Sequence, residues 1–303
     1  MTCIATRIRP LLLAVLALTI CLSTPASAQD AESEVPPNGV WTNSLTGKLS
    51  GSQAAYSNWQ EGGLNTLALT TSLDGKFVRG GDHWIQTYEM RFAFGLVQQD
   101  TLAVRKSDDL IRLGAGLQYR GDGFLQTFRP TISAALRTQF ADGFNYDEDP
   151  FGDDVERSLP VKTSSFFSPA VVTQSLGLTY EPASWISTRL GAAGKETIVN
   201  DPALRVLYDV DPDNLLRAEG GVESETTIDR ELFTNVRYQS RLNLFQTLTQ
   251  REPLDALWEN VITMKVNSWL NVGLEYVMLY DANRSDAVQI KEVLSVGVSF
   301  ALL

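Results

Sequence analysis

The stretch WIQTYEMRFAFGL, from Trp84 to Leu96, alternates two kinds of side chain. Its even positions are mostly aromatic or aliphatic, and its odd positions are charged, polar or small, apart from Ile85. Successive side chains of a β-strand point to opposite faces, so the pattern predicts a strand with one apolar and one polar face.

Similar runs recur along the chain and predict about twelve strands in all. The others lie at 43–55, 64–77, 111–119, 128–137, 172–180, 186–194, 215–226, 232–244, 256–266, 270–280 and 289–303. Most have about ten residues or more, enough to cross a bilayer at a tilt and longer than the usual strand of a soluble sheet. A soluble sandwich would also alternate, but its strands would be shorter.

The connections between these runs alternate in length. Short ones are expected at VRGGD (78–82), RGDG (120–123), EPAS (181–184), IDRE (228–231) and VNSW (266–269), and longer ones at 98–108, 140–168, 195–214, 245–254 and 281–288. Outer-membrane barrels have this rhythm, with tight periplasmic turns and long outer loops. Since lipid forbids unpaired sheet edges, we expect residues 41–303 to form a closed antiparallel transmembrane barrel.

The first residues resemble an export signal. Arg7 and Arg9 precede an apolar stretch, Leu11 to Leu22, and the small residues Ala26 to Ala28 follow it. This order predicts a signal peptide over residues 1–28, cleaved near Ala28, and a flexible segment over 29–40. Cys21 could mark a lipoprotein instead, but the bulky Ile20 precedes it.

Cleavage would leave an acidic chain without cysteine. Both cysteines, Cys3 and Cys21, lie in the leader, and removal of Arg7 and Arg9 leaves 23 basic residues against 36 acidic ones. This balance argues against nucleic acid as a partner. We expect the outer membrane of a Gram-negative-type bacterium as the location, with outer-membrane lipid as the surroundings.

Aromatic residues fall near the expected strand ends. Trp84, Tyr119, Phe124 and Tyr180 lie beside short turns, and Trp258 and Tyr280 lie near the opposite rim. This placement is typical of the two aromatic girdles of a membrane barrel, although a soluble core would bury aromatics too. In YSNWQEGGLN, we expect Trp59 at the rim of the first hairpin and Gly62 and Gly63 in its turn; ligand stacking is the alternative.

Charged residues gather at the alternate strand positions whose side chains would face the lumen. They are Arg91, Arg112, Arg129, Arg137, Arg189, Arg217, Arg237, Arg241 and Lys265, with Glu89, Glu219, Glu223, Glu259 and Glu275. One interpretation is a lumen filled by ion pairs and hydrogen bonds. The other is a narrow pore whose arginines attract anions.

Enzymatic and metal sites find less support. A hydrolase of the envelope would need a histidine paired with Ser or Asp, and the single histidine, His83, lies beside an expected short turn. Glu259 and Glu275 could act on glycosides at a suitable separation, but neighbouring cations favour charge pairing. Asp209, Asp211 and Asp213 have the spacing of a calcium loop, and a solvated acidic loop is the favoured reading, so no cofactor is expected.

Several phrases resemble one family, the barrel-like domain of unknown function 3078 of Bacteroidetes and their relatives. They include NWQEGGLN, KSDD (Lys106 to Asp109), RTQFADGFNY (Arg137 to Tyr146), FFSPA (Phe166 to Ala170), IVNDPAL, NVRYQSRLNLF, LWENVITMKVNSWL and VQIKEVLSVGVSF. The resemblance implies an outer-membrane-like barrel with no established activity.

These observations favour a non-enzymatic barrel with a structural or envelope-assembly role, and a possible envelope protein as partner. A narrow porin with an anion bias is the alternative, and an envelope hydrolase is disfavoured. The final run, with Leu294, Val296, Val298, Phe300 and Leu302 on one face, resembles the signal that barrel-insertion machinery reads, although the chain ends in Leu303.

Overall fold

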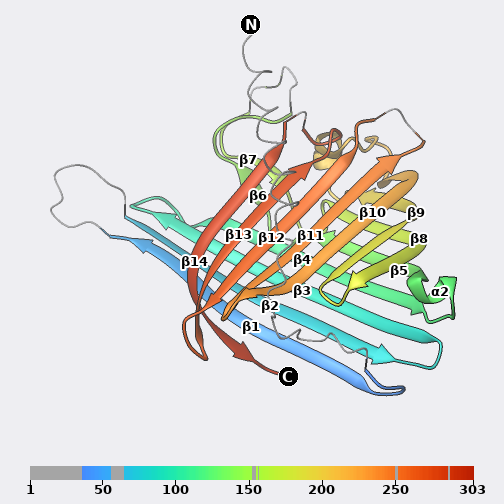
Figure 1. Ribbon diagram of the computed structural model, residues 1–303. Coiled ribbons are helices and arrows are strands. Elements are labelled where there is room, and N and C mark those ends of the chain that lie inside the picture. The colour runs from blue at the N-terminus through green and yellow to red at the C-terminus, as the bar shows by residue number, and fades with distance from the viewer. Residues whose placement is uncertain (1–35, 56–64, 152–154, 156, 250–251, 286) are drawn as a thin grey trace, which may run out of the picture. The chain divides into compact units, whose positions relative to one another are not determined.

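The computed structural model describes residues 36–55, 65–151, 155, 157–249, 252–285 and 287–303. Twelve of its strands form one closed barrel in the order β1-β14-β13-β12-β11-β10-β9-β8-β5-β4-β3-β2 (Figure 1). They are β1 (Trp41–Ala54), β2 (Thr66–Gly80), β3 (Trp84–Gln99), β4 (Arg105–Tyr119), β5 (Phe128–Thr138), β8 (Ala170–Ala183), β9 (Ile186–Ile198), β10 (Leu216–Phe233), β11 (Val236–Thr247), β12 (Asp255–Lys265), β13 (Leu270–Tyr280) and β14 (Gln289–Ala301). The predicted closed antiparallel barrel is confirmed.

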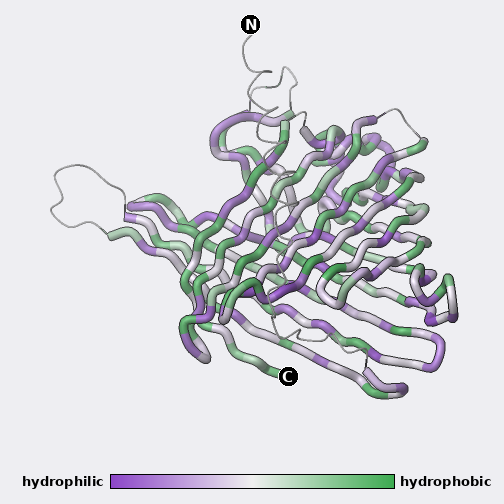
Figure 2. Tube along the Cα trace, in the orientation of Figure 1, coloured by the Kyte–Doolittle hydropathy of each residue, from purple (hydrophilic) through white to green (hydrophobic). Residues whose placement is uncertain are grey.

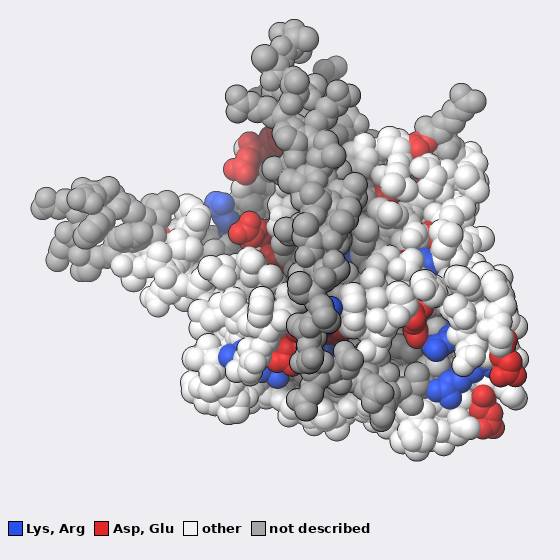
Figure 3. Space-filling model, in the orientation of Figure 1, with Lys and Arg blue, Asp and Glu red and all other residues white. Residues whose placement is uncertain are grey.

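The alternation of the sequence becomes the two faces of the wall. Hydrophilic and hydrophobic residues alternate along the strands that face the viewer in Figure 2. Outward positions are apolar and open to the surroundings, as at Leu176, which is 62% exposed, whereas the inward Glu223 is 4% exposed. Most of the described surface visible in Figure 3 accordingly carries no charge. A closed ring with an apolar outer wall satisfies both demands of a lipid bilayer.

The long connections contain structure of their own. The segment between β5 and β8 carries a small hairpin, β6 (Gly143–Asn145) with β7 (Val161–Ser164), and the 3₁₀ helix η1 (Pro202–Tyr208) follows β9. Tyr208 donates a hydrogen bond to the carbonyl oxygen of Thr163 at 2.8 Å, and Lys162 donates one to Asp201 at 3.1 Å, which raises the pKa of Lys162. These contacts join two connections at the long-loop end of the barrel.

A small apolar cluster stabilises this junction. Val199, Leu204, Tyr208 and Val210 are buried together, with Phe151 and Leu207 packed against them. Among the described residues, no helix is long and apolar enough to cross a bilayer.

Some predicted turns differ in detail from the structure; at EPAS, Glu181 to Ala183 belong to β8 and the turn is Ser184 and Trp185. The IDRE segment is not a turn, because Ile228 to Glu231 pair with Arg237 to Ser240 and β10 continues to Phe233. The turn is Thr234 and Asn235. Three consecutive charged residues, Asp229 to Glu231, resembled a turn, but alternate ones face the lumen, where Asp229 meets Arg237. At RGDG, a short helix, α2 (Phe124–Thr127), follows the predicted turn.

The true turn gives a test of the hairpin. Asn235 has φ of +67°, a left-handed conformation that other L-residues adopt at a cost. We expect Asn235→Ala to lower the free energy of unfolding by about 1 kcal/mol, and Asn235→Gly to preserve it. Urea unfolding in lipid vesicles, followed by tryptophan fluorescence, measures both; the neighbouring Thr234→Ala is the control. Equal stability of the Ala and Gly variants would contradict the assigned turn.

Candidate functional site

The lumen is the candidate site, because it collects the charged side chains that the sequence analysis singled out. Three arginines lie side by side on one wall: Arg91 is the cross-strand neighbour of Arg112, and Arg112 is that of Arg137. Like charges at neighbouring positions repel each other unless opposite charges approach. The row on β3, β4 and β5 therefore requires carboxylates from elsewhere.

Those carboxylates come from the opposite wall. Glu259 of β12 accepts a hydrogen bond from Arg112 and one from Arg137, the latter at 2.9 Å. β4 and β12 stand six positions apart in the ring of twelve, so the Arg112 contact crosses the full lumen. The Glu259 side chain is only 9% exposed. Charge-assisted hydrogen bonds of this kind are the stronger ones in proteins.

A second set of contacts crosses the lumen beside the first. Arg241 of β11 donates to Glu89 of β3, again six positions away, and lies 3.2 Å from Glu225 of β10. Arg189 of β9 lies 3.2 Å from Glu223 and 3.4 Å from Glu225. The contacts thus continue from the Arg241–Glu89 pair, which crosses the lumen, along the wall formed by β9, β10 and β11.

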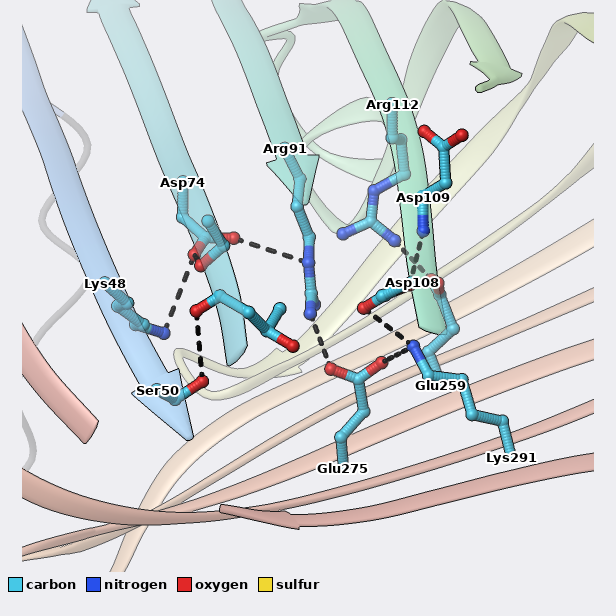
Figure 4. Close-up of polar contacts among 12 residues, drawn as sticks. Lys48, Ser50, Asp74, Arg91, Asp108, Asp109, Arg112, Glu259, Glu275 and Lys291 are labelled. Carbon is cyan, nitrogen blue, oxygen red and sulfur yellow. Dashed lines mark hydrogen bonds and ion pairs between the residues drawn. The ribbon is translucent and has the colours of Figure 1, made fainter. Parts of the chain in front are cut away.

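A third set forms a chain of five contacts, drawn in Figure 4. Lys48 lies 3.6 Å from Asp74, which lies 3.6 Å from Arg91. Arg91 donates to Glu275 at 2.7 Å, Glu275 accepts from Lys291 at 3.0 Å, and Lys291 lies 2.9 Å from Asp108. The chain links β1, β2, β3 and β4 to β13 and β14.

Sequence reasoning missed several members of this network, namely Lys48, Asp74, Asp108, Glu225 and Lys291. The sequence already contained a signal that could have found them. Lys48 and Asp74, for example, fall within alternating runs, at positions whose side chains point to the lumen. Lys265, which was predicted to face the lumen, lies exposed at the end of β12.

The remaining charged candidates lie toward the two ends of the barrel. At the short-turn end, Arg129 lies 2.7 Å from Glu181, and Arg237 donates two hydrogen bonds of 2.6 Å to Asp229. At the long-loop end, Lys195 and Arg217 each lie 3.2 Å from Glu219, a fully buried side chain. Burial, with the nearby Glu219, raises the pKa of Glu252 in the adjoining loop.

The girdle candidates contact one another near the strand ends. Trp84 and Tyr119 meet edge-on at 5.0 Å, and Phe128 lies between Phe124 and Tyr180, with centroid distances of 5.0 and 5.2 Å. Near the other end, Trp258 donates to Ser240 at 3.0 Å, and Tyr280 ends β13. Trp59, Gly62 and Gly63 lie outside the described residues.

The candidate catalytic and metal residues do not assemble into a site within the described part of the chain. His83 stacks on Tyr119 with ring centroids 6.4 Å apart, at the short-turn end. Asp209 lies 3.5 Å from Arg217, and Asp211 accepts a hydrogen bond from the backbone N–H of Asp213. No group of three or more His, Cys, Asp or Glu converges there as metal ligands would.

Solved structures similar to this chain are barrels at low sequence identity. The translocator domain of the autotransporter NalP from Neisseria meningitidis is 10% identical, with 88% of this chain and 90% of that one covered and a TM-score of 0.37. An outer membrane channel from Pseudomonas putida F1 is 13% identical, with 91% and 98% covered and a TM-score of 0.37. A mutant of the TodX monoaromatic hydrocarbon channel is 9% identical, with 88% and 90% covered and a TM-score of 0.34.

Sequence comparison gives a family match over part of the chain. No curated protein matches the sequence. Residues 52–144 match the family described as protein of unknown function (DUF3078). The predicted resemblance to the domain of unknown function 3078 is thereby confirmed over residues 52–144, which run from the end of β1 into β6.

Proposed function

We propose that this protein is a non-enzymatic β-barrel of the bacterial outer membrane, a structural or envelope-assembly component with a lumen filled by paired charges. The observation that carries the proposal is the bridge from Arg112 and Arg137 to Glu259, which joins opposite walls. A water-filled pore keeps its charges along the wall, whereas side chains that meet across the lumen occupy the path of a solute.

The charge balance supports a filled lumen over an anion pore. The three sets of contacts contain eight basic side chains, Lys48, Lys76, Arg91, Arg112, Arg137, Arg189, Arg241 and Lys291. They also contain seven acidic ones, Asp74, Glu89, Asp108, Glu223, Glu225, Glu259 and Glu275; Lys76 is counted among the basic side chains because it lies 3.8 Å from Glu89. Since an anion-selective pore depends on uncompensated positive charge, this near balance removes most of the field that the arginine row would create.

The location and the partners follow from the same features. The leader predicted at residues 1–28 implies export, and the apolar outer wall suits the lipid of an outer membrane. Phe300 lies exposed on the outward face of β14, and recognition of such an amphipathic strand would make the barrel-insertion machinery a partner. A hydrolase remains disfavoured, since the single histidine sits at a turn away from the outer rim.

The bridge can be tested by stability. We expect Glu259→Gln to lower the free energy of unfolding by about 1 to 3 kcal/mol, because Arg112 and Arg137 lose a charged acceptor in a partly desolvated lumen. Urea unfolding in lipid vesicles measures the change. Lys265→Gln, an exposed site on the same strand, is the matched control.

A double variant strengthens that experiment. Adding Arg112→Gln to Glu259→Gln removes both partners, so the combined cost should fall below the sum of the two single costs. Strict additivity would show that the cross-lumen contact contributes nothing to folding.

The choice between filled barrel and porin can be tested by conductance. In planar bilayers we expect the unmodified protein to be silent, and the quadruple variant Arg91→Ala, Arg112→Ala, Glu259→Ala, Glu275→Ala to open a path, because it removes both ends of two cross-lumen contacts. Heat-modifiable migration on gels establishes that each sample is folded. Steady, anion-selective openings of the unmodified protein would support the porin instead.

A further inference from the structure

The seam that closes the barrel is short. β1 and β14 pair only over Thr46–Gly51 and Val296–Ala301, whereas the β2–β3 ladder runs along the whole of β2. Beyond the Gly51–Val296 pair, β1 continues to Ala54 and pairs with β2, and β14 extends back to Gln289 and pairs with β13. Figure 1 shows the blue β1 and the red β14 diverging from their crossing point.

The open stretch of β14 carries apolar residues on its outward face, on both sides of Glu292. Its outward residues include Ile290 and Leu294, which are 63% and 64% exposed. Among the described residues, nothing pairs with the free edge from Gln289 to Ser295. Lipid cannot hydrogen-bond an unpaired backbone N–H or C=O, so an edge that faces lipid needs a partner that supplies backbone hydrogen bonds, which is a strand.

A carboxylate on the same edge adds a second constraint. Glu292 is the cross-strand neighbour of Tyr276, whose side chain is at an outward-facing position. The side chain of Glu292 therefore also faces outward, and it is exposed. Two copies of this chain pairing antiparallel about the middle of the edge would place Glu292 opposite Glu292, and like charges directly opposite are destabilising. The edge is therefore poorly suited to a second copy.

The outer end of β1 fits the edge. Continuing the observed register residue for residue places Ser52 opposite Ser295, Gln53 opposite Leu294 and Ala54 opposite Val293. Lumen-facing positions then meet lumen-facing positions, and no charge meets a like charge. The β3–β4 ladder has a register shift between Gly95 and Leu96, on the part of β3 that pairs with Leu69 and Thr70 of β2, and such irregularities bend a sheet locally.

Ion pairs bridge the seam where the backbone ladder is missing. Arg91 and Glu275 join β3 to β13, and Lys291 and Asp108 join β14 to β4, so both contacts span the junction from the lumen side (Figure 4). The barrel thus stays connected at this level without a continuous ladder between β1 and β14.

We propose that the free edge of β14, Gln289 to Ser295, is the docking site of the outer end of β1, and that the seam closes by extending the register from Gly51–Val296 through Gln53–Leu294. When open, the seam is a lateral gap between the lumen and the outer half of the membrane. The proposal requires a folded membrane barrel, but neither a filled lumen nor a silent one.

Paired cysteines test the docking. Cys3 and Cys21, the only cysteines of the sequence, are replaced by serine, and Gln53→Cys is combined with Leu294→Cys in the full chain folded into vesicles. The positive control is Leu49→Cys with Val298→Cys, a pair already adjacent in the seam. The mismatched control is Gln53→Cys with Val298→Cys.

We expect the Gln53–Leu294 pair to cross-link about ten- to a thousandfold more slowly than the positive control, because a minor state is populated at about 0.1–10%. It should still react faster than the mismatched pair. Ser52→Cys with Ser295→Cys repeats the test on the lumen side if the first variant does not fold. Non-reducing gels of boiled samples report the intramolecular bond.

Two results would overturn the proposal. One is reaction of the matched pair no faster than the mismatched pair in samples that remain heat-modifiable. The other is a disulfide-linked dimer of the single Glu292→Cys variant together with no intramolecular bond in the Gln53→Cys, Leu294→Cys variant, which would assign the edge to a second copy. Loss of heat-modifiable folding in the cysteine-free parent would instead contradict the membrane barrel itself.

Discussion

Backbone hydrogen bonding in hydrocarbon is the constraint on which the rest of this structure depends. Because lipid offers no donors or acceptors, strand edges need partners and the sheet must return to its first strand, as it does where Thr46–Gly51 of β1 pairs with Val296–Ala301 of β14. Ring closure then fixes the direction of every side chain, since strand alternation leaves only lumen and lipid as destinations. Most of the charged residues on the strands are directed inward as a consequence of this geometry, before any interaction among them is considered.

The same geometry explains why the lumen charges pair across the barrel. Arg91, Arg112 and Arg137 are neighbours on one wall, where they repel, and Glu259 and Glu275 stand on the facing strands. A ring of twelve strands is narrow enough for long side chains to meet across it. The two walls are thus electrostatically complementary, and each contact that neutralises the arginine row also occupies the lumen.

The strands could be predicted from sequence because each depends on a local pattern. Alternation in Trp84–Leu96 is sufficient to assign a strand and its two faces, and parity alone places Arg112 and Glu259 in the lumen. Their pairing could not be predicted, since it depends on strand tilt and on the register of closure, which involve residues about 150 positions apart. Read locally, the arginine row resembled an anion-attracting patch. The turn predicted at IDRE was wrong for a related reason. A turn and a strand with charged lumen-facing residues have similar compositions, and only the partner strand distinguishes them.

Two kinds of interaction, backbone hydrogen bonds and ion pairs, close different parts of the seam between β1 and β14. From Thr46 to Gly51, backbone hydrogen bonds join β1 to β14 directly. The strength of these bonds depends little on the salt concentration or on which side chains the strands carry. Beyond Gly51, the two sides of the seam are joined by the ion pairs Arg91–Glu275 and Lys291–Asp108, whose side chains are partly exposed. Ion pairs that water can reach are weakened by salt, whereas a paired ladder is not. The two parts of one seam therefore respond to different conditions, so the part beyond Gly51 can separate while the part from Thr46 to Gly51 keeps the barrel closed.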